Sequence, residues 1–273
     1  MLKLAAWVVL MIVNGGDNRE PTDRLVPANW SGNPWGPTAN RFRDEGKLPP
    51  IKMTADMLAW RSWGKTYLHE GDILFRRGDA RVLFGYFPFS RFIANAAGSR
   101  YSHTGIIAIE KGEPFVYDMT KAGARKQPFS VWVLDNVGAF GVKRLKPAWR
   151  PKIKQVMNYC RDMYAHQVPF DFDLEIGDNR LYCVEMTENA FRSAGLKLSE
   201  PVALRDMERI NEFPICTFAF SHLTKLKPAK RIYFPGNDRH GIWSSPLLET
   251  IYSPDPSSTS SHNVPSPPEA MQH

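Results

Sequence analysis

The feature that most constrains the fold of this 273-residue chain is residues 178–187, where a polar turn leads directly into a helix headed by a cysteine. Beyond Cys183 apolar residues recur at helical spacing, and Gly195 is a natural end for the helix. Unpaired N–H groups and the positive dipole end of such a helix favour the thiolate, the nucleophilic form of cysteine. The competing interpretation is that Cys183 is a small buried apolar residue, the commonest role of a free cysteine.

A β-hairpin predicted upstream supplies the partners that a nucleophile needs. Residues 102–109 and 115–118 have the composition of two strands joined by a Lys-Gly turn. His103 and Asp118 lie at similar distances from that turn, so pairing makes them cross-strand neighbours. A carboxylate beside a histidine fixes its tautomer and stabilises the imidazolium, as a cysteine nucleophile requires of its base. Each residue alone has an ordinary structural explanation, but the combination with Cys183 favours catalysis.

The rest of the chain predicts a mixture of helices and strands. Residues 80–97 are aromatic and indicate a helix interrupted near Pro88; they form either core packing or one wall of an acyl groove. Asp171 and Asp173 are either a carboxylate pair or two solvated acids. The remaining predicted elements are helices at 53–63 and 147–166 and strands at 73–75, 138–145 and 231–234.

Charge and cysteine content exclude several classes of protein. The formal net charge of +7 comes without a dense Lys/Arg block or zinc-finger spacing, which argues against nucleic-acid binding. The excess charge either favours contact with anionic surfaces, such as lipid headgroups or cell-wall polymers, or only aids solubility. No Cys/His set has metal-ligand spacing, so neither a metal nor another cofactor is predicted.

The three cysteines leave one redox question open. Cys160 lies on the apolar face of the helix predicted at 147–166, which favours a core position. Cys160 and Cys216 could pair in an oxidising compartment and leave Cys183 free, but spacing alone does not decide it.

The two ends of the chain differ from its middle. Residues 1–16 resemble a signal peptide, with one lysine before a short apolar run, and predict export to the periplasm or the exterior. The alternative is a short buried or interfacial segment in a cytoplasmic protein. Residues 17–69, rich in Pro, Gly, Asn and Trp, predict an irregular arm or linker; residues 70–251 form the main domain. Residues 252–273 have almost no apolar side chains and predict a disordered tail.

Six segments in this order resemble the permuted papain-like amidase family of YaeF/YiiX type, within the NlpC-type cysteine hydrolase superfamily. The resemblance covers roughly residues 70–250. The segments are Gly-Asp-Ile-Leu-Phe at 71–75, Arg-Tyr-Ser-His-Thr-Gly-Ile at 100–106, Val-Tyr-Asp at 116–118, Val-Lys-Arg-Leu at 142–145, Pro-Phe-Asp at 169–171 and Asp-Asn-Arg-Leu-Tyr-Cys-Val-Glu at 178–185.

The resemblance implies an α+β, circularly permuted papain-like core in which an antiparallel sheet packs against the helix carrying the nucleophile. It assigns Cys183 as nucleophile, His103 as general base and Asp118 as orienting residue. The family commonly has Glu at the third position, so Asp118 is one methylene shorter. Tyr101 and Tyr182 are candidates for contacts with the oxyanion or substrate.

The expected function is a cysteine hydrolase that cleaves amide bonds through a thioester, in cell-wall peptides or in N-acyl and lipid conjugates. Two alternatives stand beside it. One is a lipid acyltransferase or esterase of the related permuted group, and the other is a lipid- or peptide-binding module without catalysis. The expected partners are peptide or acyl substrates, with no nucleic acid and no integral membrane domain.

Overall fold

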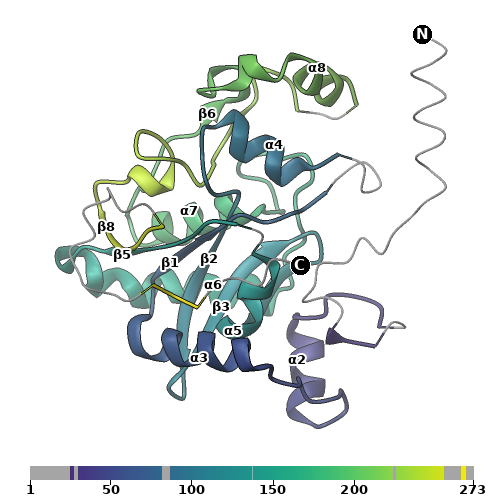
Figure 1. Ribbon diagram of the computed structural model, residues 1–273, viewed down its shortest axis with the longest axis vertical. Coiled ribbons are helices and arrows are strands. Elements are labelled where there is room, and N and C mark those ends of the chain that lie inside the picture. Colours follow the sequence, from purple (N-terminus) through teal and green to yellow (C-terminus); the bar gives the residue numbers. More distant parts are fainter. Residues whose placement is uncertain are drawn as a thin grey trace.

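The computed structural model describes residues 25–27, 30–81, 87–136, 138–223, 226–254 and 266–268 (Figure 1). The predicted signal peptide at 1–16 and most of the predicted tail at 252–273 lie outside these residues, so both stay predictions. Within the described ranges, no helix is long and apolar enough to cross a membrane.

The centre of the fold is a six-stranded sheet with the order β4-β3-β2-β1-β5-β8, in which every neighbouring pair is antiparallel. The predicted hairpin is confirmed as β2 and β3, and the strands predicted at 73–75 and 138–145 are confirmed as β1 and β5, although β5 begins two residues later than predicted. The strands are β1 (Ile73–Arg76), β2 (His103–Glu110), β3 (Glu113–Thr120), β4 (Gly123–Pro128), β5 (Phe140–Leu145) and β8 (Leu248–Tyr252). A separate pair joins β6 (Val202–Ala203) to β7 (Arg231–Ile232).

Helices cover both faces of the sheet because both faces are apolar. Successive strand residues point to opposite sides, so Ile73 and Phe75 belong to one core and Leu74 to the other. The first core packs against α6 (Ile153–Ala165) and α7 (Cys183–Ser193), and the second against α3 (Ala55–Tyr67) and α5 (Phe129–Trp132). This arrangement is the expected α+β fold (Figure 1).

The helices show where local sequence sufficed and where it did not. The predictions at 53–63 and 147–166 are confirmed as α3 and as a 3-10 turn followed by α6. After Pro88 the chain forms α4 (Phe89–Ala96), whereas residues 82–86 lie outside the described part. Phe87, Phe89 and Phe92 pack against or within the core, so the described aromatic residues of this stretch favour the core interpretation over an acyl groove.

The segment expected to be an irregular arm contains a further helix, α2 (Pro37–Asp44). Trp35 is buried just before it, and the Asn40 amide donates to Lys126 O in β4 at 2.8 Å and to the Tyr164 hydroxyl at 2.8 Å. The part of the arm around α2 is therefore packed against the edge strand β4. The three cysteines are all free, and Cys160 is buried in the core as expected.

A buried ion pair fixes the start of β1. Arg144 on β5 donates from Nε to Asp72 Oδ1 at 2.7 Å and from Nη2 to Asp72 Oδ2 at 2.8 Å. Its Nη2 also donates to Tyr67 O, the last residue of α3, at 2.8 Å. One guanidinium thus joins α3, β1 and β5, and Asp72 is completely buried.

We predict that Arg144→Met lowers the free energy of unfolding by about 3–5 kcal/mol, because it leaves the Asp72 carboxylate buried without its partner. Arg150→Met is the matched control: Arg150 pairs with Glu249 at 2.8 Å on the surface, and its loss should cost less than about 1 kcal/mol. Urea unfolding of both variants is the measurement. An equal decrease in the free energy of unfolding in the two variants would contradict the role of Arg144 as the buried partner of Asp72.

Candidate active site

Cys183 is the first residue of α7, as its sequence context predicted, and it is partly exposed. Its backbone is tied to the strand that carries His103. The Thr104 and Thr187 hydroxyls lie 2.8 Å apart, so that one donates to the other, and the hydroxyl whose proton is left donates to Cys183 O, which lies 3.3 Å from Thr104 and 3.2 Å from Thr187. These contacts hold the N-terminus of α7 against the start of β2.

His103 is the first residue of β2, and its Nε2 lies 2.8 Å from Oδ2 of Asp118 on β3. The two are not directly opposed as expected, since the register pairs Asp118 with Gly105. They are diagonal neighbours on one face, which long side chains can still bridge. Gly105 is the residue directly opposite Asp118, and a Cβ at this position would lie 3.4 Å from the Asp118 Cβ. The shorter Asp therefore reaches the histidine.

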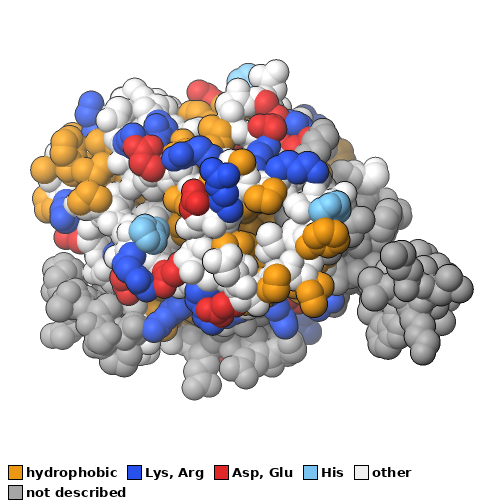
Figure 2. Space-filling view, turned by 90° about the horizontal axis from the view of Figure 1, so that it is seen from above, with side chains coloured by type: hydrophobic (Ala, Val, Ile, Leu, Met, Phe, Trp, Pro, Cys, Tyr) orange, Lys and Arg blue, Asp and Glu red, His pale blue; other side chains and the backbone are white. Residues whose placement is uncertain are grey.

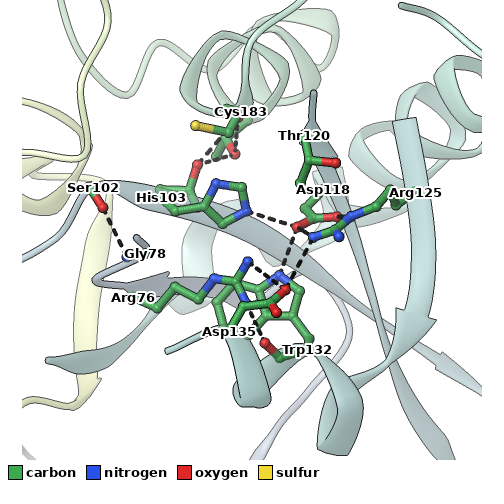
Figure 3. Close-up of polar contacts among 12 residues, drawn as sticks. Arg76, Gly78, Ser102, His103, Asp118, Thr120, Arg125, Trp132, Asp135 and Cys183 are labelled. Atoms are coloured by element: carbon green, nitrogen blue, oxygen red, sulfur yellow. Dashed lines mark hydrogen bonds and ion pairs between the residues drawn. The ribbon is translucent and has the colours of Figure 1, made fainter. Parts of the chain in front are cut away.

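The orientation of the imidazole determines which nitrogen can act as base (Figure 3). A carboxylate accepts the Nε2 proton, so the lone pair is on Nδ1. Figure 3 shows His103 between Cys183 and Asp118, with the nitrogen that does not contact Asp118 on the side of Cys183. Within the described residues, no hydrogen bond joins the Cys183 sulfur to this ring.

Behind the histidine, Asp118 is held by two further side chains that the sequence analysis did not identify. Arg125 on β4 donates from Nε to Oδ1 at 3.0 Å and from Nη2 to Oδ2 at 2.8 Å. The Trp132 indole on α5 donates to Oδ2 at 2.9 Å. The carboxylate is completely enclosed and has donors on both oxygens.

A second buried pair continues this network (Figure 3). Arg76 on β1 lies with its guanidinium 4.2 Å from the centre of the Trp132 ring and donates to Trp132 O and to Asp135 Oδ2, the latter at 3.3 Å. Asp135 also lies 3.8 Å from Arg125. Two arginines and two aspartates thus balance their charges in the core.

The surroundings of Asp118 and His103 lower the pKa of both groups. Burial raises the pKa of Asp118, but the Arg125 charge and the hydrogen bonds from His103 and Arg125 outweigh it and hold that pKa well below its usual range. Burial and the Arg76 charge lower the pKa of His103, more than the hydrogen bond and charge of Asp118 raise it. Asp118 is therefore ionised and His103 neutral at pH 7.

The expectation of a low thiol pKa at Cys183 is wrong for the free protein. Burial raises the pKa of Cys183 to about 12, although the N–H groups of Thr104 and Val184 stabilise the thiolate. The favourable groups predicted from the helix N-terminus are present, but desolvation outweighs them. The resting pair is a neutral thiol and a neutral imidazole.

The two tyrosines singled out in the sequence have partners in the core. The Tyr182 hydroxyl accepts a hydrogen bond from the Tyr233 N–H at 2.7 Å. The centre of the Tyr101 ring lies 4.7 Å from that of Trp243, and the Tyr101 side chain forms a hydrogen bond with Ser253. A role of either residue at an oxyanion stays a prediction.

The acidic residues around the cysteine loop are mostly structural. Asp171 is buried and accepts the Asp173 N–H at 2.9 Å, and Arg180 lies 3.4 Å from Asp171 and 3.5 Å from Asp173. Both acids therefore share an arginine and do not form an isolated carboxylate pair. Glu185 accepts the Gly177 N–H at 3.0 Å, and burial raises its pKa to about 7.

The comparisons with known proteins bear on the family and the fold. The family model described as "Permuted papain-like amidase enzyme, YaeF/YiiX, C92 family" matches residues 67–230. The chain belongs to this family. It is therefore a cysteine peptidase- or amidase-type enzyme with a permuted papain-like fold.

Two individual proteins are similar to the chain. The uncharacterized protein YiiX of Escherichia coli K12 is 24% identical over 167 residues, which cover 60% of this chain and 72% of YiiX. The crystal structure of YiiX from Escherichia coli O157:H7 has a TM-score of 0.57 and 19% identity, covering 68% of this chain and 98% of YiiX.

The crystallised YiiX is described as a metalloprotein. In the described ranges of the present chain, no three His, Cys, Asp or Glu side chains are grouped so that they could hold a metal ion. The residues present there do not fit a bound metal, and we assign no chemical step to one.

We predict that the His103 imidazole titrates below pH 6.5 in NMR spectra, because burial and the nearby Arg76 charge penalise the imidazolium. Arg76→Met removes the positive charge and should move the midpoint to higher pH. Arg77→Met is the control, since Arg77 donates to Asn95 Oδ1 at 2.9 Å and should leave the midpoint in place. A midpoint at or above 6.5 in the parent protein would contradict the electrostatic account.

Proposed function

We propose that the chain hydrolyses amide bonds with Cys183 as nucleophile, His103 as general base and Asp118 as orienting residue. The observation that carries the proposal is the contact of 2.8 Å between His103 Nε2 and Asp118, with Cys183 at the opposite side of the ring (Figure 3). A nucleophile, a base and a third group orienting the base are the parts that covalent catalysis requires.

The first half of the reaction forms a thioester. Nδ1 of His103 takes the Cys183 thiol proton as the sulfur attacks the carbonyl carbon, and the carbonyl oxygen becomes an oxyanion. The imidazolium then gives its proton to the leaving amine as the C–N bond breaks. Asp118 stabilises the imidazolium through Nε2–H, and Arg125 keeps this carboxylate ionised.

The second half releases the acid. A water molecule gives a proton to Nδ1 and attacks the thioester carbonyl, and the C–S bond breaks as the thiolate regains the proton from the imidazolium. The Cys183 backbone N–H, in the first turn of α7 where amides have no helical acceptor, is our candidate to stabilise both oxyanions.

The raised thiol pKa and lowered imidazole pKa support a concerted proton transfer. When Cys183 and His103 are both neutral at rest, no thiolate is present before the substrate binds. The proton therefore moves to Nδ1 only as the sulfur attacks. The buried Asp118 carboxylate then matters most in the transition state, when the ring carries its positive charge.

We propose peptides or N-acyl conjugates as substrates, since the family is one of amidases. Cell-wall peptides or lipid conjugates, met after export, remain our preferred subclass. Export is tested by fractionating cells that produce the full chain and sequencing the N-terminus of the mature protein.

The catalytic assignment is tested with a panel of peptide anilides and N-acyl amides, and by intact-mass detection of an acylated enzyme. Cys183→Ala should abolish turnover and acylation. His103→Ala should lower kcat by about 10²–10⁴, the usual contribution of a general base. Asp118→Asn should lower kcat while preserving the shape of the site.

Cys216→Ala is the matched control, because Cys216 is another free and partly exposed cysteine. It should retain parental activity. An acyl group found on Cys216, or full turnover by Cys183→Ala, would refute the proposed nucleophile.

A further inference from the structure

Helix α8 (Pro214–Leu223) presents large apolar side chains to solvent. Ile215 is 82% exposed and Phe218 is 66% exposed, more than any other large hydrophobic residue in the described part of the chain. They are three residues apart and so lie on one face of the helix. Cys216, by contrast, packs against the core. The helix therefore packs against the core through Cys216 and exposes Ile215 and Phe218 on another side.

His222 extends this exposed face. Its ring stacks on Phe218 with centroids 4.1 Å apart, and it is itself exposed. Residues Ile215, Phe218 and His222 recur at intervals of three and four, the spacing of a stripe along one side of a helix. We call these three residues the α8 stripe.

The charge beside the α8 stripe is positive. Lys227 donates to Ser221 O at the end of α8 at 2.7 Å and, within the described ranges, forms no ion pair with a carboxylate. The acids on the preceding segment are neutralised: Glu212 pairs with Arg209 at 2.6 Å, and Glu208 pairs with Arg239. Over the whole chain the formal charge is +7.

Figure 2 looks onto this end of the molecule. Apolar side chains there are interspersed with Lys and Arg side chains and with several Asp and Glu side chains, of which Glu208 and Glu212 are paired with arginines. A face that combines exposed apolar groups with basic groups complements an interface that is apolar below and negatively charged above.

The size of the α8 stripe argues against a second copy of the chain as its occupant. A stable protein interface buries about 800 Å² on each partner. A ten-residue helix is about 15 Å long, and two large side chains supply well below that area. A lipid surface needs no complementary shape, and a few inserted side chains assisted by basic groups are sufficient.

We propose that the α8 stripe and Lys227 form a peripheral docking site for an anionic phospholipid surface. Ile215 and Phe218 enter the interface between headgroups and acyl chains, and Lys227 stays at the level of the lipid phosphates. The proposal is independent of the catalytic assignment, because it uses no residue of the triad.

The test is co-sedimentation of the purified full chain with vesicles of phosphatidylcholine, alone or mixed with phosphatidylglycerol. We expect binding to the anionic vesicles only, and its loss at 1 M salt, where the screening length falls to about 3 Å. The double variant Ile215→Ser/Phe218→Ser should lower the partition coefficient at least tenfold. Both residues are exposed, so its thermal melting should match that of the parent.

Two controls separate docking from other effects. Leu58→Ser removes an apolar residue that is 49% exposed on α3 and should bind vesicles as the parent does, as should Cys183→Ala. Equal binding by the double variant, or binding to neither vesicle, would overturn the proposal. So would light scattering that shows a dimer of the parent that the double variant does not form.

Discussion

The Asp118 carboxylate is the group on which the site depends, because it is completely enclosed and remains charged. Four hydrogen-bond donors stabilise the buried negative charge: His103 Nε2, two nitrogens of Arg125 and the Trp132 indole. They come from β2, β4 and α5, so the sheet and the helix that covers it must both be in place before the carboxylate is satisfied. A buried acid without these partners would take up a proton and lose its hold on the imidazolium.

The second buried pair explains why the site can hold an arginine so close to its base. Arg76 and Arg125 are balanced by Asp118 and Asp135, so the core carries no net charge there. Burial and the Arg76 charge nevertheless disfavour a protonated His103 imidazole. Burial also disfavours a Cys183 thiolate. In the proposed mechanism the proton therefore stays on the sulfur at rest, and the charged pair forms only as the sulfur attacks a carbonyl.

Sequence patterns were sufficient where the signal is local. The turn before Cys183, the hairpin of His103 and the order of short motifs were enough for the family and the fold class, and they drew attention to a histidine and an aspartate that are in contact in the structure. Sequence patterns did not predict the features that depend on strand register and on burial. Arg125 faces Asp118 across β3 and β4, a pairing that was missed because no strand was predicted at residues 123–128. The pKa of the thiol follows from burial, which the spacing of residues does not show. The segment before residue 70 concealed α2 because Pro and Gly, which open that helix, are also typical of loops.

The most direct test of the account is the pH dependence of alkylation of Cys183 by iodoacetamide, measured by peptide mass spectrometry in the parent and in His103→Ala. A neutral thiol coupled to a neutral imidazole predicts a rate that rises as His103 loses its proton below pH 6.5, stays level, and rises again towards the thiol pKa of about 12. In His103→Ala the level region should vanish, while Cys216 reacts as before. Identical profiles for Cys183 in the two proteins would contradict the coupling and, with it, the proposed catalytic pair.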